Sequence, residues 1–186
     1  DAEAGVKVMK EASDGLAIMK ENVLTNQEVY DLVFELDGTQ PLTVTLAWTD
    51  KEGTVVGGTD STQSVLVNDL DVRVIHPGGG EVLPWRLVPG DNPNIPMFAP
   101  VAQRGDNTVD NIEKIQYQVN SINAAPAGEY TVRVSHKGSA LNSGSQKYSL
   151  IVSGGIVNDV SVDNNNFDNL KIYPNPATDV LNISAD

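Results

Sequence analysis

The sequence predicts an all-β fold, an antiparallel β-sandwich or jelly roll of about eight strands, with a short N-terminal helix. Three observations lead to this fold class. Short segments alternate between apolar and polar residues with a period of two, which is typical of half-buried strands. β-branched residues are frequent within these segments. The 16 Gly and 10 Pro lie mostly between them, where turns are needed, and 186 residues can enclose one sizeable core.

The first segment, residues 1–20, has helical rather than strand spacing. Val6, Met9, Ala12 and Leu16 recur at intervals of three and four residues, which predicts an amphipathic helix. Gly15 is a candidate for the end of its first stretch.

From residue 26 onward the period changes to two, and seven segments are predicted as strands. They are 27–36, 42–48, 69–74, 84–88, 112–119, 128–135 and 146–153. Their alternation places five aromatic residues on core faces: Tyr30, Phe34, Trp48, Tyr130 and Tyr148. Trp85 has an exposed position as an alternative, although we favour the core there too. Residues 89–103 contain four Pro and are expected to form a long ordered loop.

Charge and composition exclude several classes of function. The net charge of −13 and pI of about 4.3 oppose binding to nucleic acid or to anionic lipid, and no basic cluster offsets them. The chain has no Cys, which rules out disulfides, thiolate zinc sites and a cysteine nucleophile. No run of about 18 apolar residues is present, so we expect no insertion into a membrane. Because the chain begins at Asp1 without Met or a signal peptide, we expect a fragment of a longer protein.

The sequence offers no recognisable catalytic machinery. A serine hydrolase needs a nucleophile, a base and a group that orients the base. The two His residues, His76 and His136, both fall in or beside turns, where exposed positions are expected. No G-x-S-x-G motif occurs, and Ser143 and Ser145 lie in a loop of small polar residues. We therefore expect no catalytic and no cofactor-binding residues in this chain.

Two acidic segments are dense enough to be candidate metal sites. The first is Asn68–Asp71, with Asp69 and Asp71 on one side of a strand, and the second is Asp106–Glu113. Calcium prefers six to eight oxygen ligands from carboxylates, amides and carbonyls. The alternative is that these Asp and Asn residues cap turns and accept backbone hydrogen bonds. The candidate ligands are Asp69, Asp71, Asp106, Asp110 and Glu113.

Four segments in order then resemble a known family. Thr45–Asp50, Leu66–Val72, Asp106–Glu113 and Ala127–Val134 are similar to the jelly-roll domain that follows the catalytic domain in many bacterial subtilisin-like (S8 family) serine peptidases. The similarity continues through His136–Gly138, Gly144–Gln146 and Tyr148–Gly154. It covers about residues 23–155, and Asn68–Asp71 is its most specific part.

The two ends resemble neighbouring parts of such peptidases. Asp1–Val6 looks like the last helix of a subtilase catalytic domain, and Ile172–Leu181 resembles the opening of the C-terminal sorting domain of type IX secretion in Bacteroidetes. The predicted organisation is a catalytic-domain remnant over 1–22, the jelly roll over 23–155, a linker rich in Asn and Asp over 156–169, and a truncated sorting domain over 170–186.

The resemblance implies a non-catalytic accessory domain of a secreted or cell-surface peptidase. Such a domain would stabilise the catalytic domain of the same chain, shape substrate access or hold a protein substrate, and we expect it to be monomeric. Some members of the group bind calcium in the jelly roll. The parent would be a serine endopeptidase whose catalytic residues lie outside this chain. The alternative is an independent carbohydrate- or protein-binding β-sandwich, which would need an exposed aromatic strip or a sugar-sized groove.

Overall fold

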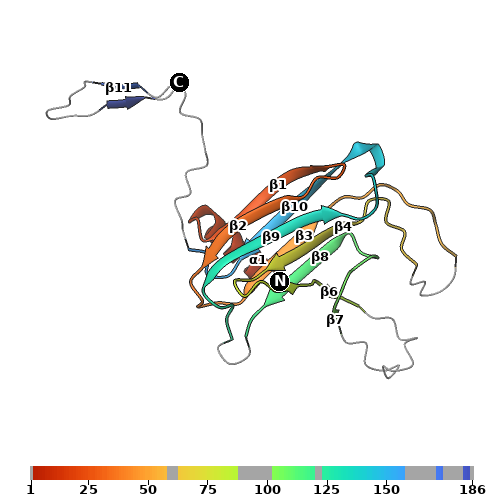
Figure 1. Ribbon diagram of the computed structural model, residues 1–186, viewed down its shortest axis with the longest axis horizontal. Coiled ribbons are helices and arrows are strands. Elements are labelled where there is room, and N and C mark those ends of the chain that lie inside the picture. Colours follow the sequence, from red (N-terminus) through yellow and green to blue (C-terminus); the bar gives the residue numbers. More distant parts are fainter. Residues whose placement is uncertain are drawn as a thin grey trace.

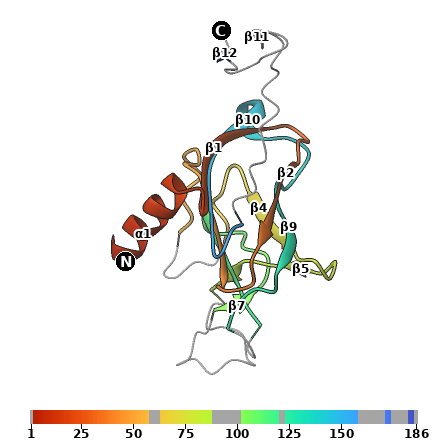
Figure 2. The same ribbon diagram turned by 90° about the vertical axis from the view of Figure 1, so that its left-hand side faces the viewer.

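The computed structural model describes residues 2–57, 63–87, 102–119 and 123–157, and the backbone of residues 171–173 and 182–184. Within these residues the chain forms two four-stranded sheets that face each other (Figures 1 and 2). One sheet has the order β1-β10-β3-β8, with β1 at Ala17–Thr25, β10 at Ser145–Ser153, β3 at Leu42–Ala47 and β8 at Ile112–Tyr117. The other has the order β2-β9-β4-β5, with β2 at Tyr30–Leu36, β9 at Gly128–His136, β4 at Leu70–Ile75 and β5 at Glu81–Val82.

This strand order is that of a jelly roll. If the eight strands of the two sheets are numbered along the chain, one sheet reads 1-8-3-6 and the other 2-7-4-5, and every pair is antiparallel. Consecutive strands therefore alternate between sheets, except for the fourth and fifth, which pair as neighbours in one sheet. The predicted fold class is confirmed. Six of the seven predicted strands are strands of these two sheets, with ends shifted by at most three residues.

The core lies between the sheets and consists of the inward residues of each alternation. In β3, Leu42, Val44 and Leu46 are fully buried, and the Thr residues between them are not. Tyr130 is the largest side chain with no exposure, and it stacks on Phe34 with ring centroids 6.2 Å apart. Trp48 and Tyr148 are also buried, and Tyr30 packs partly buried against the core. The predicted core positions of these five aromatic residues are confirmed.

The N-terminal helix is shorter than the helical spacing predicts. Helix α1 spans Ala2–Ser13, and Gly15 ends it with a φ of +74°. The Gly15 and Leu16 N–H groups bond the carbonyls of Ala12 and Glu11, a pattern that closes many helices at glycine. The following residues are strand β1 and pair with β10 from Ala17↔Ser153 to Thr25↔Ser145.

Both predicted limits of the jelly roll, residues 23 and 155, are therefore wrong, and so is the helical remnant predicted over 1–22. Residues 17–22 belong to the sandwich, because they pair with β10 and satisfy the backbone groups along its edge. At the other end, Ile156 is buried and bridges Leu36, and the Val157 N–H donates to the Glu35 carbonyl. Residues 156 and 157, predicted as the start of the linker, thus pack on the sandwich, and residues 158–169 lie outside the described part.

Two small ribbons complete the described chain. β6 (Trp85–Arg86) pairs with β7 (Gln103–Arg104), and the expected loop between them falls mostly on residues 88–101, outside the described residues. The favoured core position of Trp85 is wrong. Its side chain is 39% exposed, and the Arg104 guanidinium lies 3.9 Å from its ring centroid.

β11 (Lys171–Tyr173) and β12 (Asn182–Ser184) form a separate antiparallel pair. No helix in the described ranges is long and apolar enough to cross a membrane.

Candidate functional site

Four carboxyl groups from three parts of the chain meet where β4 and β8 contact each other, and we call them the acidic cluster. Asp69 and Asp71 lie at the start of β4, Asp106 lies in the turn after β7, and Glu113 lies in β8. One oxygen from each of Asp71, Asp106 and Glu113 lies within 4.8 Å of the other two. Four of the five predicted metal ligands are therefore brought together, although they come from separate segments.

The pairing of the strands explains why these residues meet. β5 pairs only with Val74 and Ile75, so the first residues of β4 have no strand beside them on that edge. Glu113 alternates with the exposed Ile112 and Lys114 and therefore points into the sandwich from the opposite sheet. Its carboxylate Oε2 accepts a hydrogen bond of 2.6 Å from the Val72 N–H. A side chain thus replaces the missing strand as the partner of β4 at this point.

Glu113 is the most deeply buried acid of the cluster. Its side chain has no exposure, and its Oε1 is one of three buried side-chain atoms among the described residues that have no hydrogen-bond partner. Burial raises the pKa of Glu113 to about 8, and the Asp71 carboxylate adds to that rise. The Val72 N–H opposes the rise but does not cancel it. Glu113 is therefore largely protonated at neutral pH.

Asp71 and Asp106 share a hydrogen bond but have opposite pKa shifts. Asp71 is buried, and burial followed by the hydrogen bond with Asp106 raises its pKa. Asp106 is half exposed. Burial opposes its ionisation too, but hydrogen bonds from Asp71, Lys137 and Arg73 outweigh that effect and lower its pKa to about 2. Asp106 is the ionised member of this pair.

Two cationic side chains lie among these acids. The Lys137 ammonium is 3.2 Å from Asp69 Oδ2 and 3.0 Å from the Oδ1 atoms of both Asp71 and Asp106. The Arg73 guanidinium is 2.9 Å from Asp71 Oδ1 and 2.6 Å from Asp106 Oδ1. Burial would lower the pKa of Lys137, but its hydrogen bonds to Asp106 and Asp71 raise it to about 12. Both groups carry their charge throughout the range in which proteins are stable.

The sequence-based site missed both cations and included one acid that is elsewhere. Arg73 could have been found, because it follows Asp69 and Asp71 at a spacing of two residues and so lies on the same side of the strand. Lys137 could not, because the pairing of β4 with β9 brings it there across 66 residues of chain. Asp110 lies apart from the cluster and accepts a hydrogen bond of 3.1 Å from Asn107 Nδ2. Its backbone N–H donates to Asn107 Oδ1, so this pair caps a turn.

A second polar network surrounds Asn68, next to the acidic cluster. Asn68 is 2% exposed, its Nδ2 donates to Gln146 Oε1 at 2.7 Å, and its Oδ1 accepts from the Asn142 N–H at 2.7 Å. The Asn68 carbonyl accepts from Trp48 Nε1 at 3.0 Å. The side-chain amide of Asn68 thus bonds to β10 and to the turn that precedes it, and its backbone carbonyl bonds to Trp48 at the end of β3. The network is structural in character.

The described residues do not assemble a catalytic site. Neither histidine is the exposed turn residue that was expected, because both are partly buried and occupied. His136 Nε2 accepts from the Gln27 N–H at 2.9 Å, and His76 stacks on Tyr117. Lys51 donates to Ser143 Oγ, a pairing that some hydrolases use. Both of these side chains are exposed to water, however, whereas a lysine base requires desolvation.

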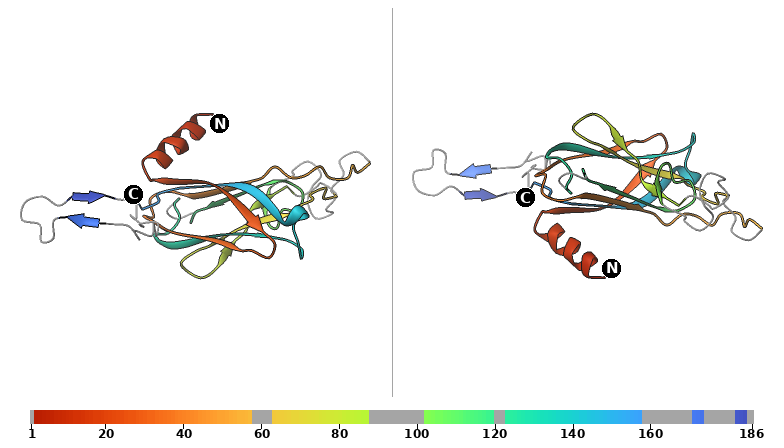
Figure 3. Two further views of the ribbon diagram at one scale, coloured as in Figure 1. Left: turned by 90° about the horizontal axis from the view of Figure 1, so that it is seen from above. Right: turned by 90° about the horizontal axis from the view of Figure 1, so that it is seen from below.

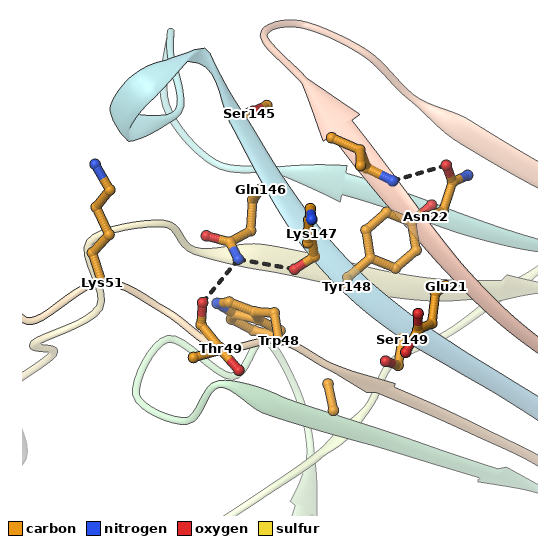
Figure 4. Close-up of a pocket in the computed structure, with 12 residues that line it drawn as sticks. Glu21, Asn22, Trp48, Thr49, Lys51, Ser145, Gln146, Lys147, Tyr148 and Ser149 are labelled. Carbon is orange, nitrogen blue, oxygen red and sulfur yellow. Dashed lines mark hydrogen bonds between the residues drawn. The ribbon is translucent and has the colours of Figure 1, made fainter.

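One depression of the described surface, of about 780 Å³, is lined by residues of β1, β10 and the end of β3 (Figure 4). It is open and lined by polar residues of both charges, including Glu21, Lys51 and Lys147. Gln146 Nε2 donates to the Thr49 and Lys147 carbonyls beside it. Trp48 and Tyr148 border the depression but are 4% and 3% exposed, so neither presents a face to a ligand. This surface has no strip of exposed aromatic rings.

Comparison with known proteins identifies no family for this chain. No protein-family model matches it, and no curated protein matches it. Among solved structures it is similar to the crystal structure of Aeromonas hydrophila PliG, a periplasmic lysozyme inhibitor of g-type lysozyme. The sequence identity is 15%, the match covers 74% of this chain and 85% of that one, and the TM-score is 0.36. A similarity of that degree carries no argument about binding or activity.

Proposed function

We propose that this chain is a non-catalytic accessory domain of a secreted or cell-surface subtilisin-like serine peptidase. The order of the four segments that resemble such jelly rolls supports the proposal, as does the lack of an assembled catalytic site among the described residues. The observation that carries it is an exposed apolar surface on α1 and β1. A peptidase catalytic domain of the same parent chain is the partner that the resemblance places next to this surface.

The surface, which we call the helix–strand surface, consists of five side chains. Their exposed fractions are 67% for Val6, 62% for Met9, 45% for Leu16, 47% for Met19 and 40% for Val23. α1 contains no buried residue and extends away from the sandwich beside β1 (Figures 2 and 3). Scattered exposed apolar residues are normal, but five of them on a projecting helix and the residues that follow it are what an interface would use.

The role that fits this surface is mechanical. Burial of these side chains against the catalytic domain would hold the sandwich in place and add stability at about 25 cal/mol per Å² of apolar surface. The polar faces of the sandwich would remain in water, where the net charge of −13 keeps the domain soluble. We propose a monomeric arrangement in which the sandwich stabilises the peptidase or limits access to its cleft.

The test uses the complete parent peptidase. Met9→Glu introduces a charge into the helix–strand surface, and Val33→Glu is the matched control, since Val33 is 55% exposed on β2, away from α1. We expect Met9→Glu to shorten the half-life of peptidase activity at elevated temperature by several fold and to increase autolysis. Val33→Glu should behave like the wild type. Equal half-lives for the two variants would contradict the proposal.

The second candidate, an independent carbohydrate- or protein-binding module, has one observation in its favour. Trp85 is the only large aromatic residue among the described positions with substantial exposure. Arg104 covers one face of its ring, so Trp85 alone does not make a platform. Quenching of tryptophan fluorescence by a panel of glycans reports on Trp85, because Trp48 is buried. Saturable quenching that disappears in Trp85→Phe would favour this candidate.

A further inference from the structure

We infer that the Lys137 ammonium, beside the Arg73 guanidinium, is the cation held by the acidic cluster, and that the cluster therefore takes no calcium ion. The resemblance implies calcium in this type of domain, and the acidic residues in isolation would fit it. The contacts of the cluster do not. This inference concerns the sandwich itself and does not depend on the proposed role in a peptidase.

The geometry around Lys137 is that of an ammonium ion held by three acceptors. Its Nζ has three protons and lies 3.0–3.2 Å from one oxygen each of Asp69, Asp71 and Asp106. The side chain starts from a fixed position, because the Lys137 N–H donates to the Asp69 carbonyl at 2.9 Å where β4 and β9 pair. The ammonium is thus delivered to the cluster by the strand register.

Two of the oxygens that a calcium ion would need already contact two cations each. Asp71 Oδ1 and Asp106 Oδ1 each contact both Lys137 Nζ and Arg73 Nη2. Calcium requires six to eight oxygens at about 2.3–2.6 Å, and an ion that close to these two atoms would have to displace both cations. Asp110, the remaining predicted ligand, bonds to Asn107 and lies outside the cluster.

Two oxygens of the cluster, Asp69 Oδ1 and Glu113 Oε1, are buried and have no hydrogen-bond partner. A metal ion is one way to satisfy such atoms, and a proton is another. Each of these two carboxyl groups is already held through its other oxygen: Glu113 Oε2 accepts from the Val72 N–H, and Asp69 Oδ2 contacts the Lys137 ammonium. These contacts, together with the two cations that lie among the acids, hold the cluster without a divalent ion.

The experiment is thermal unfolding of this chain in chelator, in calcium and in magnesium at matched ionic strength, for the wild type and two variants. Lys137→Met removes the ammonium but keeps an unbranched apolar side chain. Lys147→Met, on the outer side of β10, removes an equivalent charge away from the cluster. We expect the wild type to melt at one temperature in all three solutions. Lys137→Met should melt about 4–8 °C lower in chelator, and Lys147→Met should not.

Calcium should raise the melting temperature of Lys137→Met in a saturable manner, because Asp69, Asp71 and Asp106 then lose the ammonium that they share. Magnesium, which demands octahedral geometry, should substitute poorly. A saturable calcium-specific rise in the wild type would overturn the inference, and so would equal melting of Lys137→Met and Lys147→Met. If Lys137→Met does not fold, calorimetric titration of the wild type with calcium decides alone: heat of binding overturns the inference, and its absence supports it.

Discussion

The carboxyl group of Glu113 accepts a 2.6 Å hydrogen bond from the backbone N–H of Val72, and these two residues belong to opposite sheets of the sandwich. The bond joins the sheets at the point where β4 has no neighbouring strand. It also explains why an acid occupies a fully buried position, because the unpaired N–H would otherwise be left without an acceptor in the interior. The arrangement makes the stability of the sandwich depend on the protonation state of one residue.

The first prediction follows from that dependence on pH. The folded-state pKa of Glu113 is raised to about 8 from an ordinary value of 4.5, so the folded protein binds the extra proton between these values. The stabilisation that the folded protein gains from keeping this proton on Glu113 is complete below about pH 4.5, and it is lost as the pH rises towards 8. Glu113→Gln should remove this loss and flatten the pH profile, a difference of about 2–4 kcal/mol between pH 5 and pH 8.5.

Urea unfolding at several pH values measures this difference. Glu35→Gln, at an exposed position on β2, is the control and should unfold in parallel with the wild type. The opposite effect is expected of Asp106, whose pKa is lowered to about 2, since its contribution disappears only as the pH falls through that value. Parallel profiles for Glu113→Gln and the wild type between pH 5 and pH 8.5 would show that Glu113 is not held in its neutral form.

The second prediction concerns Trp48, which is 4% exposed and donates its Nε1–H to the Asn68 carbonyl. Trp48→Ala should lower the free energy of unfolding by about 3–5 kcal/mol, since it removes a large buried ring and the hydrogen bond. Trp85→Ala should cost about 1 kcal/mol or less, because that ring is 39% exposed. Chemical denaturation compares the two variants, and equal losses would contradict the placement of these rings.

The third prediction tests the network around Asn68. Asn68→Ala should destabilise the domain by about 2–4 kcal/mol, because the Asn142 N–H and the buried Gln146 Oε1 both lose a partner. Asn68→Asp keeps the acceptor for Asn142 but loses the donor to Gln146, so its cost should be larger at neutral pH than at low pH. Asn22→Ala, whose side chain accepts from the adjacent Val23 N–H on the exposed side of β1, should cost well under 1 kcal/mol. A similar cost for Asn68→Ala and Asn22→Ala would count against the network.

The fourth prediction concerns catalysis. This chain should hydrolyse neither peptide nor ester substrates, because Lys51 and Ser143 are exposed and both histidines are occupied by other contacts. Fluorogenic peptides and p-nitrophenyl esters provide the assay. Turnover that persists through purification and is lost in Ser143→Ala, but not in Ser145→Ala, would establish a lysine-assisted serine site and overturn the accessory role.

The sequence by itself determined the fold class and most of the core. Local alternation identified six strands of the two sheets, because each strand buries every second residue and this pattern is visible in consecutive residues. It also placed Phe34, Trp48 and Tyr130 correctly. Strand β1 was missed because its buried residues, Ala17 and Leu24, are seven positions apart and its centre is exposed. Its strand conformation comes from pairing with β10, a contact that the local pattern does not contain.

The composition of the acidic cluster was decided by the tertiary structure. Density of carboxylates in the sequence indicated Asp69, Asp71, Asp106 and Glu113, and that density says nothing about which cations lie beside them. The register of β4 with β9 brings Lys137 to three of these acids, and Glu113 bonds to the Val72 N–H at the unpaired edge of β4. Burial then separates the pKa values of neighbouring carboxyl groups. Desolvation and ion pairing act through space, so a linear reading could locate the acids but not their charge.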